Sequence, residues 1–285
     1  MRVGDLDRAD VASAAWRTVG RYFVGTSGFA SPSQRSNLSA QSGSACDVLT
    51  AYADRLGAVE MDSVYHRRPS PQTVRSWCEA TPSGFSISVC VPREVMHVIR
   101  LGPLGRLRSF VEALEPLGSR LGCLVFTTPP DFECDVDRVR MLLEAIPHGT
   151  RTVWDLRNRS LVCPEIYDLL VEYGAAPTIV DNLQPSGSPK EVLAQGVIDG
   201  RWRTPFVYLR FRRERYRTGD LLAWGRELGN VLRAGREVYA FFRQGAEATA
   251  YAQAMAEVLG EAEAVEQGPV LEQYVPEGLE TVQVR

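Results

Sequence analysis

The chain is almost without lysine and has little histidine. Basic residues number 32 in 285, and only one of them, Lys190, is lysine. A Schiff-base mechanism therefore has almost no amine to use. The three histidines (His66, His97 and His148) are too few for a multinuclear zinc centre.

No Cys-x-x-Cys spacing occurs among the six cysteines, which argues against a zinc ribbon, a thioredoxin motif, a tetrahedral zinc site or a disulfide. Residues 1–16 carry three aspartates and lack a signal-peptide core, and no run approaches the roughly 18 apolar residues of a membrane span. We therefore expect a reduced, cytoplasmic protein without a membrane segment. The cysteines are Cys46, Cys78, Cys90, Cys123, Cys134 and Cys163.

Strong charge of one sign is also missing, since the formal net charge is -3. This value gives no global attraction to nucleic acid or anionic lipid. Residues 201–217 are rich in arginine and aromatic residues, but a strand through their middle would hide part of that patch, so we favour a solvated loop. A hydrophobic content of 45% with 24% charged residues is typical of a globular protein with a sizeable core.

Apolar or alternating runs, each typical of a strand, alternate with segments of helical period. The predicted strands are 21–26, 58–62, 85–91, 123–127, 152–157, 178–181, 206–212 and 238–243. The predicted helices are 47–56, 71–77, 104–117, 136–146, 164–173, 220–232 and 246–259, with a weaker one at 189–195.

Eight such alternations predict an α/β fold, a single TIM-type (β/α)8 barrel, and the length agrees with about 250 residues for this architecture. No Gly-x-Gly-x-x-Gly follows the first strand, which disfavours a Rossmann fold. We assign 1–20 to an N-terminal segment, 21–260 to the barrel and 261–285 to an acidic C-terminal extension. Residues 31–44, rich in Ser, Gln and Asn, are expected to form a long loop.

Polar side chains cluster where the predicted strands end. Because successive side chains of a strand point to opposite faces, Glu60 and Asp62 should share the inward face, as should Tyr208, Arg210 and Arg212. The same reasoning, with Asp181 added as a further residue at a strand end, places four acids and four arginines at or near the barrel mouth. They are Glu60, Asp62, Asp155, Asp181, Arg157, Arg210, Arg212 and Arg243.

Two interpretations of this cluster remain open. The ions could compensate one another as a structural network, because buried charges persist only when paired. Alternatively, the arginines bind a phosphate or carboxylate, and the loops after strands seven and eight often form such a site. In that interpretation Asp62 and Asp155 are candidate acid or base, Glu60 and Asp181 orient them, and the arginines bind the ligand together with Asn158, Tyr208 and Ser27.

Other chemistries are weaker candidates. The four acids could hold Mg²⁺ or Mn²⁺, although we predict no cofactor. Paired carboxylates could hydrolyse a glycoside, but nearby arginines would lower the pKa that a general acid needs raised. Cys90 could be a thiolate, but a buried core residue is the commoner role.

The strand ends, taken in order, resemble the YecE-like family, domain of unknown function 72, which is a TIM-type barrel. The resemblance spans roughly residues 22–259. It is carried by Gly25-Thr26-Ser27-Gly28, Val59-Glu60-Met61-Asp62-Ser63, Tyr65, Pro69-Ser70-Pro71, Pro92-Arg93, His97, Pro129-Pro130, Asp155-Leu156-Arg157-Asn158, Ser160, Asp181 and Tyr208-Leu209-Arg210-Phe211.

Several strand-end residues depart from the family's pattern and suggest an altered or lost activity. At nine positions this chain has a residue of a different type from the one usual in the family. These residues are Phe29, Asp62, Cys90, Thr127, Asp155, Leu161, Arg212, Arg243 and Gln244. The sequence thus predicts a barrel that binds an anionic small molecule at its mouth, as a hydrolase or an isomerase. The alternative is a catalytically decayed barrel with a binding or accessory role, and the sequence leaves the oligomeric state open.

Overall fold

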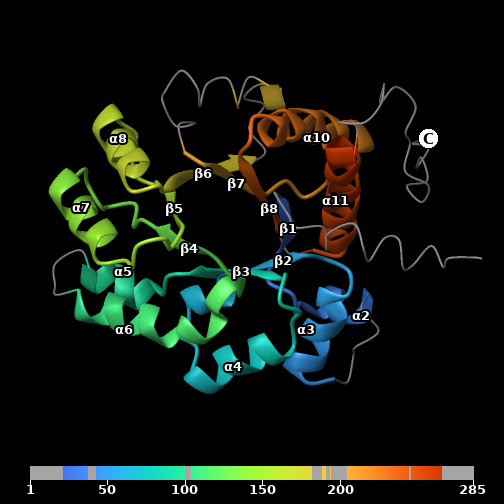
Figure 1. Cartoon of the computed structure of the whole chain (residues 1–285), viewed down its shortest axis with the longest axis horizontal. Coiled ribbons are helices and arrows are strands. Elements are labelled where there is room, and N and C mark those ends of the chain that lie inside the picture. The colour runs from blue at the N-terminus through green and yellow to red at the C-terminus, as the bar shows by residue number, and fades with distance from the viewer. Residues whose placement is uncertain are drawn as a thin grey trace, which may run out of the picture.

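Eight parallel strands close into a barrel in the order β1 to β8, and the helices surround it (Figure 1). The computed structural model describes residues 22–37, 43–99, 104–181, 188–190, 193, 204–243 and 245–264. The strands are β1 (Tyr22–Ser27), β2 (Ala58–Met61), β3 (Ser86–Cys90), β4 (Leu121–Thr127), β5 (Thr152–Asp155), β6 (Ala176–Asp181), β7 (Phe206–Phe211) and β8 (Glu237–Arg243). The predicted TIM-type fold is confirmed.

Most strands are followed by one or two helices before the next strand begins, as a parallel barrel requires. The helices are α2 (Pro32–Asn37), α3 (Ala45–Ala53), α4 (Pro71–Glu79), α5 (Arg93–Ile99), α6 (Gly105–Ala113), α7 (Val136–Glu144), α8 (Pro164–Glu172), α10 (Thr218–Arg233) and α11 (Ala248–Ala264). Short 3₁₀ turns η1 (Asp62–Tyr65), η2 (Glu115–Arg120) and η3 (Arg159–Leu161) complete them. None of the helices in the described ranges is long and apolar enough to cross a membrane.

Helix starts follow local sequence signals. The Ser70 hydroxyl accepts a hydrogen bond from the Thr73 amide at 3.1 Å, and Pro71 occupies the first turn of α4, as predicted. Ser44 and Asp47 form a capping box at the start of α3.

The prediction of a loop over 31–44 was wrong in its first half, because α2 forms there. Gln34 holds it: the side-chain amide donates to Thr26 Oγ1 at 3.0 Å and to the Gly28 carbonyl at 3.1 Å. Ser31 and Gln34 also cap each other in a Ser-x-x-Gln box, a signal present in the sequence. Residues 38–42 lie outside the described residues.

The helix predicted over 104–117 also ends early, since α6 stops at Ala113 and η2 follows. Pro116 lacks an amide hydrogen and cannot continue an α-helix. The predicted helix at 189–195 and the extension beyond Ala264 fall mostly or wholly outside the described residues.

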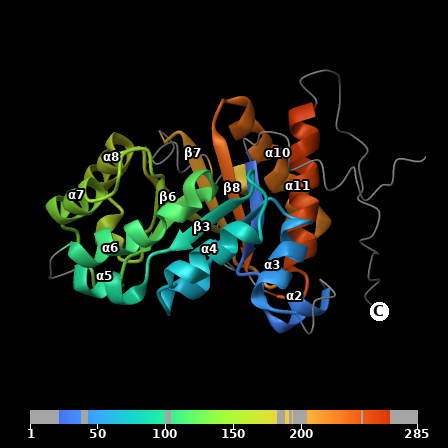
Figure 2. The ribbon, with the colours of Figure 1, turned by 60° about the horizontal axis from the view of Figure 1, so that its bottom comes forward.

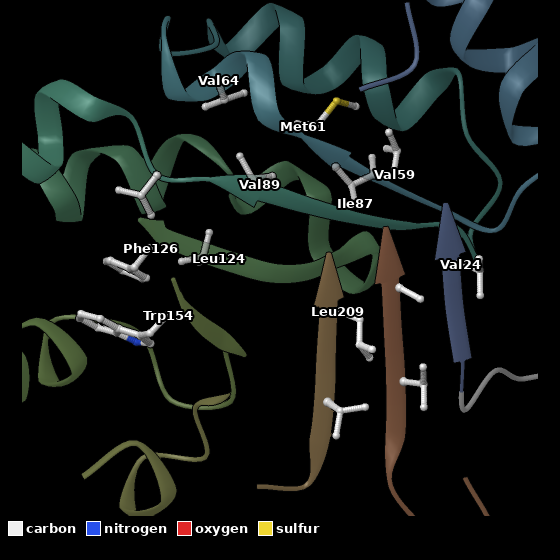
Figure 3. Packing of buried hydrophobic residues seen from close by; sticks show 14 of the residues in the cluster. Val24, Val59, Met61, Val64, Ile87, Val89, Leu124, Phe126, Trp154 and Leu209 are labelled. Atoms are coloured by element: carbon white, nitrogen blue, oxygen red, sulfur yellow. The ribbon is translucent and has the colours of Figure 1, made fainter. Parts of the chain in front are cut away.

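Two apolar layers hold the barrel. Outside, residues such as Val59, Met61 and Val89 pack between the strands and the helices (Figure 3). Inside, the lower barrel is filled mainly by aromatic rings, among them Tyr239, which stacks on Phe23 with ring centroids 4.7 Å apart. With its base filled in this way, the barrel interior can accommodate a polar site at its upper end.

Helices α10 and α11 lie side by side in both views (Figures 1 and 2). Their close approach requires glycine, because a Cβ at Gly225 would meet a Val258 methyl carbon at 2.2 Å. Elsewhere in the barrel wall, β5 and β6 are joined by only two register pairs, Val153 with Ala176 and Trp154 with Pro177. Pro177 has no amide hydrogen to give to the ladder, which explains the short pairing.

Candidate functional site

Glu60, at the end of β2, lies at the centre of the upper barrel and is fully buried. Its Oε1 accepts a hydrogen bond from Ser27 Oγ at 2.8 Å, and its Oε2 accepts from Tyr208 OH at 2.7 Å and from Arg210 Nε at 2.8 Å. The inward orientation predicted for Glu60, Tyr208 and Arg210 therefore holds.

The ionised form of Glu60 is stabilised by these partners. Burial alone would raise the pKa of the carboxyl, but Arg210 and Arg212, with hydrogen bonds from Tyr208 and Ser27, outweigh it and hold the pKa below its usual range. Glu60 is thus ionised at neutral pH and is poorly suited to donate a proton.

Arg210 is the centre of the ion network and is only 5% exposed. Besides Glu60, its Nη1 donates to Asp155 Oδ2 at 3.1 Å and its Nη2 lies 3.5 Å from Cys90 Sγ. All three guanidinium nitrogens thus have a protein partner, so Arg210 links β7 to β2, β3 and β5. Burial raises the pKa of the Cys90 thiol, which therefore stays protonated at neutral pH.

Arg157 and Arg212 lie above this network, at the edge of a cavity of about 360 Å³. The Arg212 side chain is 26% exposed and donates to Ser27 Oγ at 3.2 Å, with a longer contact of 3.5 Å to Glu60 Oε1. The Arg157 side chain is 48% exposed and its Nε lies 3.4 Å from Asp155 Oδ2. A guanidinium has five N–H donors, so these contacts use only part of the capacity of each.

Asp62 also lines the cavity, in the 3₁₀ turn that follows β2. Burial and the neighbouring Glu60 charge raise the pKa of this carboxyl, although Arg212 opposes them. The same turn contributes Ser63, Tyr65 and His66 to the lining. Sequence reasoning did not assign His66 to the site, and its position just after β2 was the available signal.

Two residues predicted at the mouth lie elsewhere. Asp181 is in register with Phe211, an outward residue, so it faces outward and binds Arg213 Nε and Trp224 Nε1 at 2.9 and 3.1 Å. Arg243 is exposed at the end of β8 and lines a separate hollow with Arg213 and Arg215. The predicted convergence of four arginines was therefore wrong for Arg243.

Three further residues predicted to bind substrate have structural partners instead. Asn158 donates to the Pro130 carbonyl at 2.8 Å and caps η3 through Ser160. Ser27 and Tyr208 lie one layer below the cavity, on Glu60, and neither lines it.

The acids do not assemble as metal ligands. Arg210 places its own cation between the carboxylates of Glu60 and Asp155. Among the described residues, no group of three or more His, Cys, Asp or Glu side chains is placed to hold a metal ion. The same pairing opposes glycosidase chemistry through Glu60, whose lowered pKa does not suit a general acid.

A second, more apolar cavity of about 230 Å³ lies beside β5, β6 and β7. Asp155 lines it together with Tyr167, Pro177, Val180 and Phe206. Asp155 thus lies between this pocket and the two arginines, Arg157 and Arg210, that border the mouth cavity.

The fold and this mouth define a TIM-type barrel whose upper interior is an acid–arginine network beneath an open polar cavity. The chain belongs to the DUF72 family, described as proteins of unknown function, whose model matches residues 23–274. No curated protein matches the chain in sequence.

Solved structures of the same family share the fold. A DUF72 protein from Enterococcus faecalis is 19% identical, with 84% of this chain and 95% of that chain covered and a TM-score of 0.62. A DUF72 protein from Thermotoga maritima is 20% identical, with 87% and 99% covered and a TM-score of 0.61. At these identities the likeness concerns the fold.

Proposed function

We propose that the protein binds a small anionic molecule, carrying a phosphate or a carboxylate, in the cavity at the C-terminal mouth of the barrel. The observation that carries the proposal is the placement of Arg157 and Arg212 at the cavity edge with 48% and 26% of their side chains exposed. Arg guanidinium groups bind carboxylate and phosphate oxygens through paired charged hydrogen bonds. The cavity volume of about 360 Å³ suits a small molecule.

The arginines differ in how fully protein acceptors occupy them, and this difference supports the proposal. Arg210 is fully committed to protein partners, and its charge is balanced by Glu60 and Asp155. Arg157 and Arg212 make longer contacts, of 3.2 Å or more, to protein acceptors. A ligand can therefore compete for the outer pair without breaking the buried pair.

Ligand shape follows from the neighbouring pocket. Beyond Asp155 the surroundings become largely apolar, with Tyr167, Pro177 and Phe206 in the wall. We therefore favour a ligand that joins the anionic group to an apolar body.

Proton transfer would belong to Asp62. Of the candidate acids that reach the cavity, it is the one whose pKa is raised, and it faces the space where the ligand would lie. A hydrolase or an isomerase acting on the anion would use this carboxyl as its acid or base. The alternative is binding without turnover, which is favoured by the commitment of Glu60 and Asp155 to ion pairs.

Thermal melts with and without phosphate, sulfate and citrate test the proposal. We expect the anion to raise the melting temperature of the wild type, and Arg212→Ala and Arg157→Ala each to weaken binding by about 1.5–3 kcal/mol. Arg140→Ala is the matched control, because Arg140 pairs with Glu172 on the outer helices. Equal anion stabilisation in all four proteins would contradict the proposed site, and Arg243→Ala checks that the separate hollow does not contribute.

A further inference from the structure

We propose that Cys134 and Cys163 form a redox-active pair that closes to an intramolecular disulfide on reaction with a small-molecule disulfide. The two sulfur atoms are 3.8 Å apart, although 29 residues separate them in the sequence. Cys134 is exposed and Cys163 is half-buried, so a small oxidant can reach the pair. All six cysteines lie in the described part of the chain, and this is the one pair of sulfurs in contact there.

The two loops that carry these cysteines are already held together. Cys134 lies between β4 and α7, and Cys163 immediately precedes Pro164 at the start of α8. The Cys134 amide donates to Ser160 Oγ at 2.9 Å, and Ser160 in turn binds Asn158 Oδ1 at 2.9 Å. Forming the disulfide therefore shortens a contact of 3.8 Å to a bond of about 2.0 Å between loops that hydrogen bonds already hold together.

The other four cysteines do not offer this geometry. Cys90 and Cys123 are 3% and 0% exposed within the barrel. Cys78 donates its thiol hydrogen to the Pro116 carbonyl, with the sulfur 3.2 Å from that oxygen, and Cys46 is half-buried at the start of α3. An accessible pair is therefore confined to the loops after β4 and β5.

The reaction is a two-step thiol–disulfide exchange. One cysteine loses its proton, its sulfur bonds to one sulfur of the small disulfide, and the S–S bond of that molecule breaks to release one thiol. The second cysteine then loses its proton and attacks the protein sulfur of the mixed disulfide, which releases the second thiol. The protein loses two electrons and two protons, and the small disulfide gains them.

The pH dependence of the rate is set by the local charges. Partial desolvation of the sulfur and the adjacent Cys163, with smaller contributions from Glu165 and Asp135, raise the pKa of the Cys134 thiol to about 11. Only the thiolate attacks, so Cys134 reacts slowly at neutral pH and faster as the pH rises toward that value. Slow closure near pH 7 and faster closure near pH 9 are the expected signature.

Metal binding is the other use of two neighbouring thiols, and the surroundings do not favour it. A structural zinc site takes four ligands, usually Cys or His. Within the described ranges, no third Cys, His, Asp or Glu joins Cys134 and Cys163 in a metal-binding group.

The test uses the full chain, reduced, freed of reductant and incubated with glutathione disulfide near pH 9. Alkylation in denaturant, read by intact mass, should count six thiols before incubation and, with two lost to the bond, four afterwards. Peptide mapping should join Cys134 to Cys163. Cys134→Ser and Cys163→Ser should each stop at the mixed disulfide, whereas Cys46→Ser should still close the bond.

Melting curves of each variant establish that it is folded before the thiols are counted. The proposal is overturned if six thiols remain after incubation, or if the bond joins other cysteines or two chains. Closure at the same rate in Cys134→Ser would overturn it equally.

Discussion

Glu60 and Arg210, 150 residues apart in the chain, meet at 2.8 Å between Oε2 and Nε beneath the mouth cavity. Side-chain exposure there is 0% for Glu60 and 6% for Arg210, so the pair is screened little by water. Removal of either partner would leave an uncompensated charge in a desolvated position.

Arg210→Ala should therefore destabilise the fold by about 3–5 kcal/mol, with or without an anion present. Urea unfolding near pH 7 measures this change. Arg140→Ala removes an exposed pair and should cost no more than about 1 kcal/mol. If both variants lose similar stability, the buried network does not support the barrel as we infer.

The Arg210 effect should also depend on pH. The pKa of Glu60 is held below its ordinary value of 4.5, so its ion pairs stabilise the fold above that pH and are lost as the pH falls below it. In Arg210→Ala the main stabilising charge is absent and burial raises the pKa of Glu60. The difference in unfolding free energy should hence shrink between about pH 7 and about pH 3. A constant difference would argue against an ionised Glu60.

The charge of Asp62 should make anion binding depend on pH. Its pKa is raised above 3.8, and protonation removes a negative charge from the cavity wall. Sulfate affinity should therefore increase as the pH falls through this raised value. Asp62→Asn should bind sulfate more tightly at neutral pH and lose this pH dependence while also losing any turnover. Calorimetric titration at several pH values provides the check, and an unaltered profile in Asp62→Asn would exclude Asp62 from the site.

Gly25 stands where the barrel wall has no room for a larger side chain. A Cβ there would lie 1.8 Å from the Ala58 carbonyl oxygen, which belongs to the neighbouring strand and cannot rotate away. Gly25→Ala should lower the free energy of unfolding by about 1–3 kcal/mol or more. Gly84→Ala is the matched control, since nothing lies within 4 Å of its added methyl group. Thermal denaturation of the two variants should separate them clearly.

The barrel was predictable because strand signals are local. A run such as Phe206–Phe211 combines apolar and aromatic residues, and a parallel strand buried on both sides reads this way. The inward face of β7 followed from the alternation of Tyr208 and Arg210 alone. Such inferences need no knowledge of which strands are neighbours.

The composition of the site was harder to predict because it depends on contacts across the barrel. Alternation places Arg243 on the inward face, but where its long side chain ends depends on the surrounding loops. Asp181 was misassigned because its face depends on its register with β7, which a six-residue strand does not reveal. The 3.8 Å approach of Cys134 and Cys163 likewise arises from two different loops, so spacing in the sequence could not show it.

The short pairing between β5 and β6 makes the barrel mechanically unequal around its circumference. Two register pairs join these strands, whereas six join β7 and β8. A sheet opens locally most easily where the fewest backbone hydrogen bonds join neighbouring strands. Among the barrel strands, amide hydrogen exchange should therefore be fastest between β5 and β6. Asp155 ends β5 and also binds Arg210. The ion pair between Asp155 on β5 and Arg210 on β7 therefore strengthens the part of the barrel wall where backbone hydrogen bonding is weakest.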